Sequence, residues 1–202
     1  MSGYDSHRYA TVNRWDPSHL KRIDRLLPLH PGQRVLEVGC GQGHLTGRLA
    51  ERGIDVVGID ANPNAAVVSG SDRVLCMSAE SLDFPDSEFD AIVSVHAIEH
   101  IPPLEEAVAE MARVLKPGGR ALFIYPAEPI QGLYAVPTSV ILHGTPFRAR
   151  EVHCHKLSPR KVRALMEPHG LVETHHEFNL VKSPQFISVF SKPRAAGGSD
   201  TR

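Results

Sequence analysis

The fold is decided by one stretch, Arg34-Val35-Leu36-Glu37-Val38-Gly39-Cys40-Gly41-Gln42-Gly43, in which a short apolar run meets three glycines at alternate positions. A short apolar run bounded by glycines is typical of a buried strand. Leu45 and Leu49 then stand at helical spacing, so a helix follows. Glycines between a strand and a helix let the backbone turn tightly and approach a ligand closely. The stretch therefore predicts a strand, a ligand-binding loop and a helix.

Outward from this stretch, apolar runs alternate with helical patterns. Strands that are apolar on both faces and alternate with helices indicate a parallel sheet that is covered on both sides. The expected strands are 34–38, 54–60, 73–77, 89–95 and 121–125, and the expected helices among them are 45–50 and 104–115.

Capping residues mark two further helices, and the chain closes with a pair of strands. Asp16-Pro17 and Ser158-Pro159 each place a capping side chain before a proline, so helices begin there and run to about 27 and 167. The runs 171–179 and 185–192 predict two antiparallel strands at the edge of the sheet.

Composition excludes several classes of protein. Lys and Arg number 22 against 23 Asp and Glu, and a net charge of −1 argues against a broad basic surface that coats nucleic acid. No stretch approaches the about 20 apolar residues that a membrane helix needs. The first residues carry no apolar signal-peptide core, so we expect no membrane partner and a cytoplasmic location. The three widely spaced cysteines predict neither a disulfide framework nor a paired-cysteine zinc site.

Two acids give the glycine loop its chemistry. Asp60 ends the second strand, where a carboxylate can accept hydrogen bonds from both hydroxyls of a ribose. The glycine spacing is G-x-G-x-G and departs from the G-x-G-x-x-G pattern of dinucleotide sites. Glu37, just ahead of the loop, disfavours a pyrophosphate and suits a cationic ligand, such as a sulfonium that carries an α-amino group.

Four motifs in this order resemble those of the class I S-adenosylmethionine (SAM)-dependent methyltransferases. They are the loop Glu37–Gly43, the ribose-binding acid in Val57–Asp60, the segment Ser78–Asp90, similar to D-A-E-x-L-P-F-P-D-x-S-F-D, and the L-K-P-G-G turn in Val114–Arg120. The resemblance covers roughly residues 30–125. It implies a Rossmann-like α/β fold with a mostly parallel seven-stranded sheet, an antiparallel C-terminal strand and helices on both faces.

The resemblance also implies a cofactor site for SAM, with S-adenosylhomocysteine as the product. The family usually has Asp where this chain has Ser78, so either Ser78 accepts the adenine amino group less strongly or the Ala79 backbone carries recognition, and we expect modest SAM affinity. The residues assigned to the cofactor are Glu37, Gly39, Gly41, Gly43, Asp60, Ala61, Ser78, Ala79, Glu80 and Ser94.

The 202 residues suffice for one domain with a core of its own. We expect a flexible arm over 1–15, a single methyltransferase domain over 16–193 and a disordered tail over 194–202. Residues 126–157 carry four prolines and little periodicity. We therefore interpret them as an insertion over the active site that forms much of the acceptor pocket.

Catalysis of methyl transfer requires a nucleophile in line with the methyl group, and a base where that nucleophile carries a proton. The fourth strand runs into His96-Ala97-Ile98-Glu99-His100. On one turn of helix, the spacing i, i+3, i+4 places His96, Glu99 and His100 on the same side. An unperturbed imidazole, with a pKa of about 6.5, suits proton removal at neutral pH. His96 and His100 are therefore the candidate catalytic residues.

Two further resemblances leave a metal site open. Ile98-Glu99-His100 resembles a segment of the ubiquinone-pathway O-methyltransferases. Together with a later His155-Lys156, it is also similar to the metal-binding residues of the small-RNA 3′-terminal 2′-O-methyltransferases. Carried across, the ligands of a divalent metal would be His96, Glu99, His100 and His155. We expect instead the packing role that such residues have in methyltransferases without a metal.

The leading hypothesis is methyl transfer from SAM to an oxygen or nitrogen nucleophile of a small molecule, as in secondary-metabolite biosynthesis. The alternatives are a metal-dependent RNA 2′-O-methyltransferase and a non-catalytic SAM-binding protein. We expect a small-molecule acceptor rather than nucleic acid, and a monomer or a homodimer. The residues expected to line the acceptor pocket are Tyr125, Tyr134, His143 and Phe147.

Overall fold

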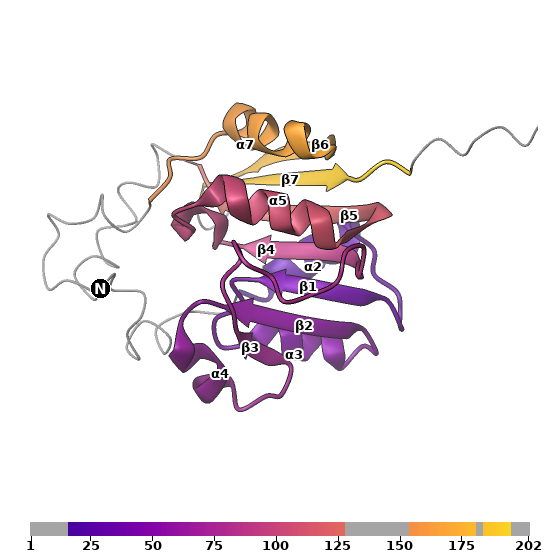
Figure 1. Ribbon diagram of the computed structural model, residues 1–202, viewed down its shortest axis with the longest axis vertical. Helices are drawn as coiled ribbons and strands as arrows, with labels where there is room; N and C mark the ends of the chain where they lie inside the picture. Colours follow the sequence, from indigo (N-terminus) through magenta and orange to yellow (C-terminus); the bar gives the residue numbers. More distant parts are fainter. Residues whose placement is uncertain (1–15, 128–153, 181–183, 195–202) are drawn as a thin grey trace, which may run out of the picture.

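The computed structural model describes residues 16–127, 154–180 and 184–194. Within these ranges seven strands form one sheet in the order β3-β2-β1-β4-β5-β7-β6, with helices on both faces (Figure 1). The pairings among β1 to β5 are parallel, whereas β7 runs antiparallel to both β5 and β6. The α/β fold class, with its mostly parallel sheet and antiparallel C-terminal strand, is thereby confirmed.

The elements follow the expected order along the chain. The strands are β1 (Arg34–Val38), β2 (Asp55–Asp60), β3 (Val74–Cys76), β4 (Phe89–Val95), β5 (Leu115–Pro126), β6 (Val172–Asn179) and β7 (Gln185–Ser191). The helices are α2 (Ser18–Leu26), α3 (His44–Ala50), α4 (Pro63–Ser69), α5 (Leu104–Val114) and α7 (Pro159–Met166), with 3₁₀ turns η2 (Ile98–His100) and η5 (Glu167–His169).

Side-chain hydrogen bonds mark the start of three of these helices. Ser158 caps α7 and accepts from the N–H of Lys161, as the sequence predicts. Asp16 accepts from the N–H of Ser18, but the N-cap residue of α2 is Pro17 and not Asp16 as expected. The third helix, α4, was not predicted, because its seven residues are too short to show a period. It begins at Pro63 behind Asn62, whose side chain accepts from the next backbone N–H.

The central strands are apolar on both faces because each face packs into its own hydrophobic layer. Leu36 faces a layer that contains Val108 of α5, whereas its neighbour Val35 faces a layer with Ile23 of α2 and Leu45 of α3. In Figure 1, α5 lies in front of the sheet, and α2 and α3 lie behind it. The sheet is therefore the middle of three layers, as the apolar runs indicated.

The order of the strands fixes where a ligand can bind. β1 lies between β2 and β4, and the chain leaves β1 toward β2 and β3 on one side before it continues with β4 and β5 on the other. Open α/β sheets bind ligands beyond the carboxyl ends of the strands at such a switch point. The loops after β1 and β4 touch there, because a Cβ added to Gly39 would lie 2.1 Å from Cβ of Ala97.

Several sequence-based expectations lie outside the described residues. They are the arm 1–15, nearly all of the tail, most of the insertion 126–157 and the candidate pocket residues Tyr134, His143 and Phe147. These remain predictions. Across the described ranges, the helices fall short of the length and apolar character that spanning a bilayer demands.

Candidate active site

The loop after β1 is built from glycines in the left-handed region. Gly39, Gly41 and Gly43 have φ angles of 76°, 50° and 72°. At Gly43 an added Cβ would also lie 2.6 Å from Cγ2 of Val74. Side chains at these positions would strain the backbone or clash with neighbours, so the loop presents bare backbone at the end of the sheet.

Asp60, the last residue of β2, holds this loop in place. Its Oδ2 accepts from the Gly41 N–H at 2.8 Å, and its Oδ1 accepts from the Asn62 N–H at 2.9 Å. Burial raises the pKa of Asp60, although both backbone hydrogen bonds act in the opposite direction. Each carboxylate oxygen keeps further acceptor capacity, which is what the two hydroxyls of a ribose require.

Glu37 lies under the loop as a buried carboxylate. Its side chain is on β1, the residue is 4% exposed, and Oε2 accepts from the Thr46 hydroxyl at 2.5 Å. Desolvation raises the pKa of Glu37 to about 7, against the lowering effect of Thr46 and with a small addition from Asp60. None of the described groups that shift this pKa is a cation. A cationic ligand would therefore supply the positive partner that the Glu37 carboxylate does not have among these groups.

Two residues that the sequence analysis missed complete this half of the site. A Cβ added to Gly58 on β2 would lie 2.4 Å from Oγ1 of Thr46 and 2.8 Å from Cβ of Cys40. Gly58 therefore lets the glycine loop and α3 approach the sheet closely, which brings the Thr46 hydroxyl to Glu37. The available signal was a glycine inside an otherwise apolar strand, which indicates a close approach of backbone or side chains.

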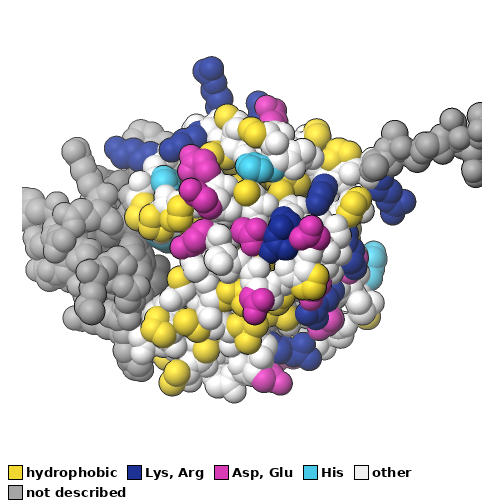
Figure 2. Space-filling model, in the orientation of Figure 1, with side chains coloured by type: hydrophobic (Ala, Val, Ile, Leu, Met, Phe, Trp, Pro, Cys, Tyr) yellow, Lys and Arg dark blue, Asp and Glu magenta, His cyan; other side chains and the backbone are white. Residues whose placement is uncertain are grey.

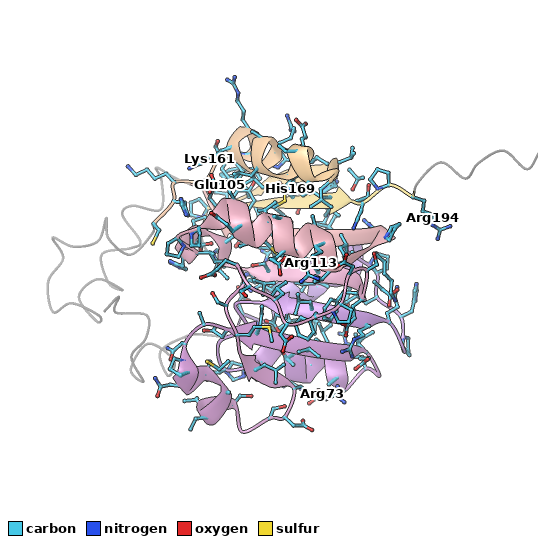
Figure 3. All side chains as sticks on the ribbon, viewed as in Figure 1. Arg73, Glu105, Arg113, Lys161, His169 and Arg194 are labelled. Atoms are coloured by element: carbon cyan, nitrogen blue, oxygen red, sulfur yellow. The ribbon has the colours of Figure 1, made fainter. Side chains whose placement is uncertain are left out.

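The segment after β3, where the resemblance places the adenine, is clamped by α5. Arg113 projects from α5 toward it (Figure 3) and donates to the carbonyls of Phe84 at 2.8 Å and Leu82 at 3.0 Å. Glu110, which pairs with Arg113 at 2.7 Å, accepts from the Leu82 N–H at 2.9 Å. One ion pair therefore fixes both the N–H and the carbonyl of the same loop residue.

The other residues that we expected to bind the cofactor differ in how far they are buried. Ser94 is fully buried, and its hydroxyl donates to the Val38 carbonyl at 3.0 Å, so it links β4 to β1 rather than facing an open pocket. Just beyond the ends of β2 and β3 the structure leaves Ala61 exposed, Ser78 and Glu80 half-buried, and Ala79 buried.

A buried carboxylate lies between two imidazoles after β4. Glu99 is 1% exposed, and its Oε1 lies 3.6 Å from Nδ1 of His96 and 3.8 Å from Nε2 of His100. Burial alone would raise the pKa of Glu99, but the two imidazoles lower it by more. The three residues meet as expected, although not on an α-helical turn. His96 has a φ of +52° ahead of η2, a backbone conformation that non-glycine residues adopt at a cost.

His96 is also held by strand β7, a link that the sequence did not reveal. Its Nε2 lies 3.0 Å from Oε1 of Gln185, the first residue of β7, which is 2% exposed. The ring of His19 on α2 lies 5.6 Å from the His96 ring. Burial lowers the pKa of His96, but Glu99 and Gln185 raise it by more, and the net shift is upward. Burial and His96 together lower the pKa of His19 to about 4.

The side chain of His155 does not join the other three candidate metal ligands. The Nε2–H of His155 instead donates to the carbonyls of Ile101 at 2.7 Å and Pro102 at 3.1 Å. Over the ranges that the structure describes, no three His, Cys, Asp or Glu side chains are arranged to hold a metal ion. The geometry therefore gives no support to the metal site at His96, Glu99, His100 and His155.

Tyr125 does not line a pocket, contrary to expectation. It is fully buried in the layer under α5 and α7, and its hydroxyl lies 3.1 Å from Oγ of Ser188, across the β5–β7 pairing. Burial raises its pKa to about 12. The prediction was wrong because both faces of β5 are covered: Tyr125 packs into one hydrophobic layer and its neighbour Ile124 into the other.

The described surface is mixed in charge. On the face in Figure 2, acidic and basic side chains lie interspersed over the helices and the loops between them. Binding to nucleic acid usually relies on a concentrated basic patch. On this face the described residues form no concentrated basic patch.

Comparison with known proteins gives a match over this same region. A family model described as a methyltransferase domain matches residues 36–123, from β1 into β5. The 27-O-demethylrifamycin SV methyltransferase of Amycolatopsis mediterranei is 30% identical over 161 residues, which cover 74% of this chain and 57% of that protein. An uncharacterized methyltransferase of Synechocystis is 34% identical, and the match covers 67% of each protein. The chain spans about half the length of the curated relatives it matches.

A solved structure shares the architecture. The crystal structure of the cyclase SpnF gives a TM-score of 0.71 at 19% sequence identity, covering 88% of this chain and 81% of that one. At so low an identity the likeness shows the fold alone. The fold by itself does not determine the reaction, so the residues of the site must carry that argument.

Proposed function

This chain belongs to the class I SAM-dependent methyltransferase family, and on that premise we propose that it transfers a methyl group from SAM to an oxygen or nitrogen nucleophile of a small molecule. The site has two halves at one end of the sheet. The glycine loop, Glu37 and Asp60 form the cofactor half, and the segment His96–His100 forms the acceptor half.

The observation that carries this proposal is the pairing of Glu37 and Asp60 around the glycine loop. Asp60 is fixed by the Gly41 N–H and keeps acceptor capacity for ribose hydroxyls. Glu37 is a buried carboxylate without a cationic partner among the described groups, which fits the α-amino group of SAM. These residues fit SAM better than a dinucleotide, whose pyrophosphate Glu37 would repel. The bound cofactor supplies an electrophilic methyl group.

The acceptor half supplies a proton acceptor. His96 and His100 lie on either side of the buried Glu99 carboxylate, at 3.6 Å and 3.8 Å, and Nε2 of His96 also lies 3.0 Å from Oε1 of Gln185. His96 is the first candidate base, because an imidazole titrates near neutral pH. His100, on the other side of Glu99, is the second candidate base. A positioned base of this kind is required for an acceptor hydroxyl or ammonium. The relative named for a 27-O-demethylrifamycin acts at an oxygen of a small molecule, which favours the same class here.

Calorimetric titration with SAM tests the cofactor half. We expect binding at one site that Asp60→Asn weakens by at least about tenfold, the value of one charge-assisted hydrogen bond. Asp55→Asn is the matched control, because Asp55 stands at the opposite end of the same strand and pairs with Arg34. It should leave the dissociation constant unchanged. Absence of SAM binding by the native chain would refute the proposal.

Methyl transfer itself is tested with isotope-labelled SAM and a panel of phenols, aliphatic alcohols and amines, with products detected by mass spectrometry. We expect label in at least one of these classes, and its loss in a variant that lacks both His96 and His100. Tight SAM binding without transfer to any of the three classes would instead favour the non-catalytic alternative.

A further inference from the structure

Arg22 of α2 is a buried arginine that forms no ion pair with the residues that the structure describes. It is 9% exposed, and within the described ranges its side chain makes one hydrogen bond, from Nη1 to the Ser18 hydroxyl at 2.7 Å. Arg25 on the same helix, by contrast, pairs with Glu177 at 2.6 Å. A buried charge is costly unless a counter-charge or several hydrogen bonds compensate it. Arg22 has five N–H donors, so most of them are left for a ligand.

The Arg22 side chain points toward the acceptor half. At the last turn of α2 the Leu26 carbonyl accepts from Arg120, whose partner on β4 is Ala91, near the start of that strand. The first turn of α2 therefore lies toward the carboxyl ends of the parallel strands. Arg22 reaches back by one turn to Ser18, as long side chains on a helix do, and its guanidinium is directed to that end.

Two histidines surround the guanidinium at this end. His19 of α2 is 8% exposed, and its ring lies 5.6 Å from the ring of His96. Burial, the charge of His96 and, more weakly, that of Arg22 lower the pKa of His19 to about 4, so its ring is neutral at pH 7. The Arg22 charge also acts against the imidazolium of His96. The His96 side chain is 30% exposed, so this cluster is accessible from outside.

We propose that Arg22 binds a carboxylate of the acceptor, so that the substrate carries its oxygen or nitrogen nucleophile and a carboxylate on one small molecule. The planar guanidinium matches a carboxylate with two parallel hydrogen bonds. A single negative charge fits better than the two of a phosphate, because two carboxylates already face the histidines. Asp16 acts on His19, and Glu99 lies 3.6 Å from His96.

The position of Arg22 favours the acceptor over SAM, which also carries a carboxylate. The glycine loop and Glu37 lie at β1, whereas the neighbours of Arg22 follow β4 and contact β7: His96 lies 3.0 Å from Gln185, the first residue of β7. In the sheet, β4 and β5 separate β1 from β7. The inference therefore rests on the proposed function and adds the class of its substrate.

The test measures binding rather than turnover. Salicylate, mandelate and β-alanine serve as probes, one each for the phenols, aliphatic alcohols and amines, and each is compared with its primary amide, which lacks the negative charge. Nuclear magnetic resonance of the ¹⁵N-labelled native chain follows each titration, with and without S-adenosylhomocysteine. We expect at least one acid to bind at least about tenfold more tightly than its amide. Its carboxylate should also raise the pKa of His19, because a nearby negative charge favours the imidazolium.

Variants of α2 assign this preference to Arg22. Arg22→Gln should abolish the preference for the acid and leave the affinity for SAM unchanged. It removes a buried charge without a described counter-charge, so it should fold at least as stably as the native chain. Arg22→Lys keeps the charge without the planar fork, and should retain part of the preference. Arg25→Gln is the matched control, because Arg25 is exposed on the same helix and should not affect the preference.

Equal affinities of every acid and its amide for the native chain would overturn the inference. So would a full preference for the acid in folded Arg22→Gln. If that variant also loses affinity for SAM, Arg22 serves the carboxylate of SAM instead. Failure of the proposed function would look different, since it would appear as absent methyl transfer by the native chain, whether or not the chain prefers an acid to its amide.

Discussion

Replacing Glu37 by Gln should move cofactor affinity and fold stability in opposite directions. Glu37 is buried on β1, and desolvation raises its pKa to about 7 despite the hydrogen bond from Thr46. The fold therefore favours the protonated carboxyl, whereas a cationic cofactor favours the ionised one. Gln keeps the shape and an acceptor for the Thr46 hydroxyl, and removes only the charge.

The stability change follows from linkage. The pKa of Glu37 rises from an ordinary 4.5 to about 7 on folding, so the stabilising preference for the protonated form is complete below pH 4.5 and is lost as the pH rises through 7. At about 1.36 kcal/mol per pKa unit, ionised Glu37 costs the unliganded fold about 3 kcal/mol at pH 8. Glu37→Gln should recover most of this free energy of unfolding.

The affinity change has the opposite sign. Because binding requires the ionised carboxylate, the dissociation constant of the native chain should be about twofold higher at pH 7 and about tenfold higher at pH 6 than at pH 8.5. Glu37→Gln should lose this pH dependence. It should also bind SAM about 10- to 100-fold more weakly at pH 8.5, the value of a hydrogen bond to a charged group.

Calorimetry from pH 6 to 8.5 measures the affinity, and urea unfolding at pH 8 measures the stability. Glu88→Gln serves as the control, because Glu88 is a partly buried carboxylate that pairs with Arg34 away from the cofactor half. It should leave the pH dependence of SAM affinity intact. The reasoning is refuted if Glu37→Gln keeps that dependence, or if it is less stable than the native chain at pH 8.

Three further predictions concern the framework of the site. Gly39→Ala should cost more free energy of unfolding than Gly32→Ala in urea titrations, by about 1–3 kcal/mol, because both have positive φ but only Gly39 meets a neighbour. Equal costs would mean that no close packing exists there. Arg113→Ala should raise amide hydrogen exchange over residues 82–86 about tenfold or more, since it removes their clamp; unchanged exchange contradicts the clamp. Tyr125→Phe should lower the free energy of unfolding by about 1 kcal/mol, one buried hydrogen bond, and an unchanged value would place its hydroxyl in solvent.

The fold class and the cofactor half could be predicted because their signals are local. Apolar runs, glycine spacing and capping residues act over a few neighbouring positions, so β1, its loop and the acid after β2 could be read along the chain. The features that the sequence did not predict were a short helix and a strained residue. The helix α4 has too few residues to show a helical period. The spacing of His96, Glu99 and His100 predicted a helical turn, and such spacing cannot show that the backbone of His96 is left-handed.

The sequence by itself thus determined the order of the elements, the glycine loop and the presence of Glu37, Asp60 and Glu99. Tertiary structure decided which distant residues meet them. Gln185 stands 89 positions from His96, and they touch because β7 inserts between β5 and β6 with its first residue at the carboxyl end of the parallel strands. Thr46 reaches Glu37 only because Gly58 lacks a side chain, and Tyr125 is turned into the core. Such contacts follow from topology and packing, since no interaction between neighbours in the sequence encodes them.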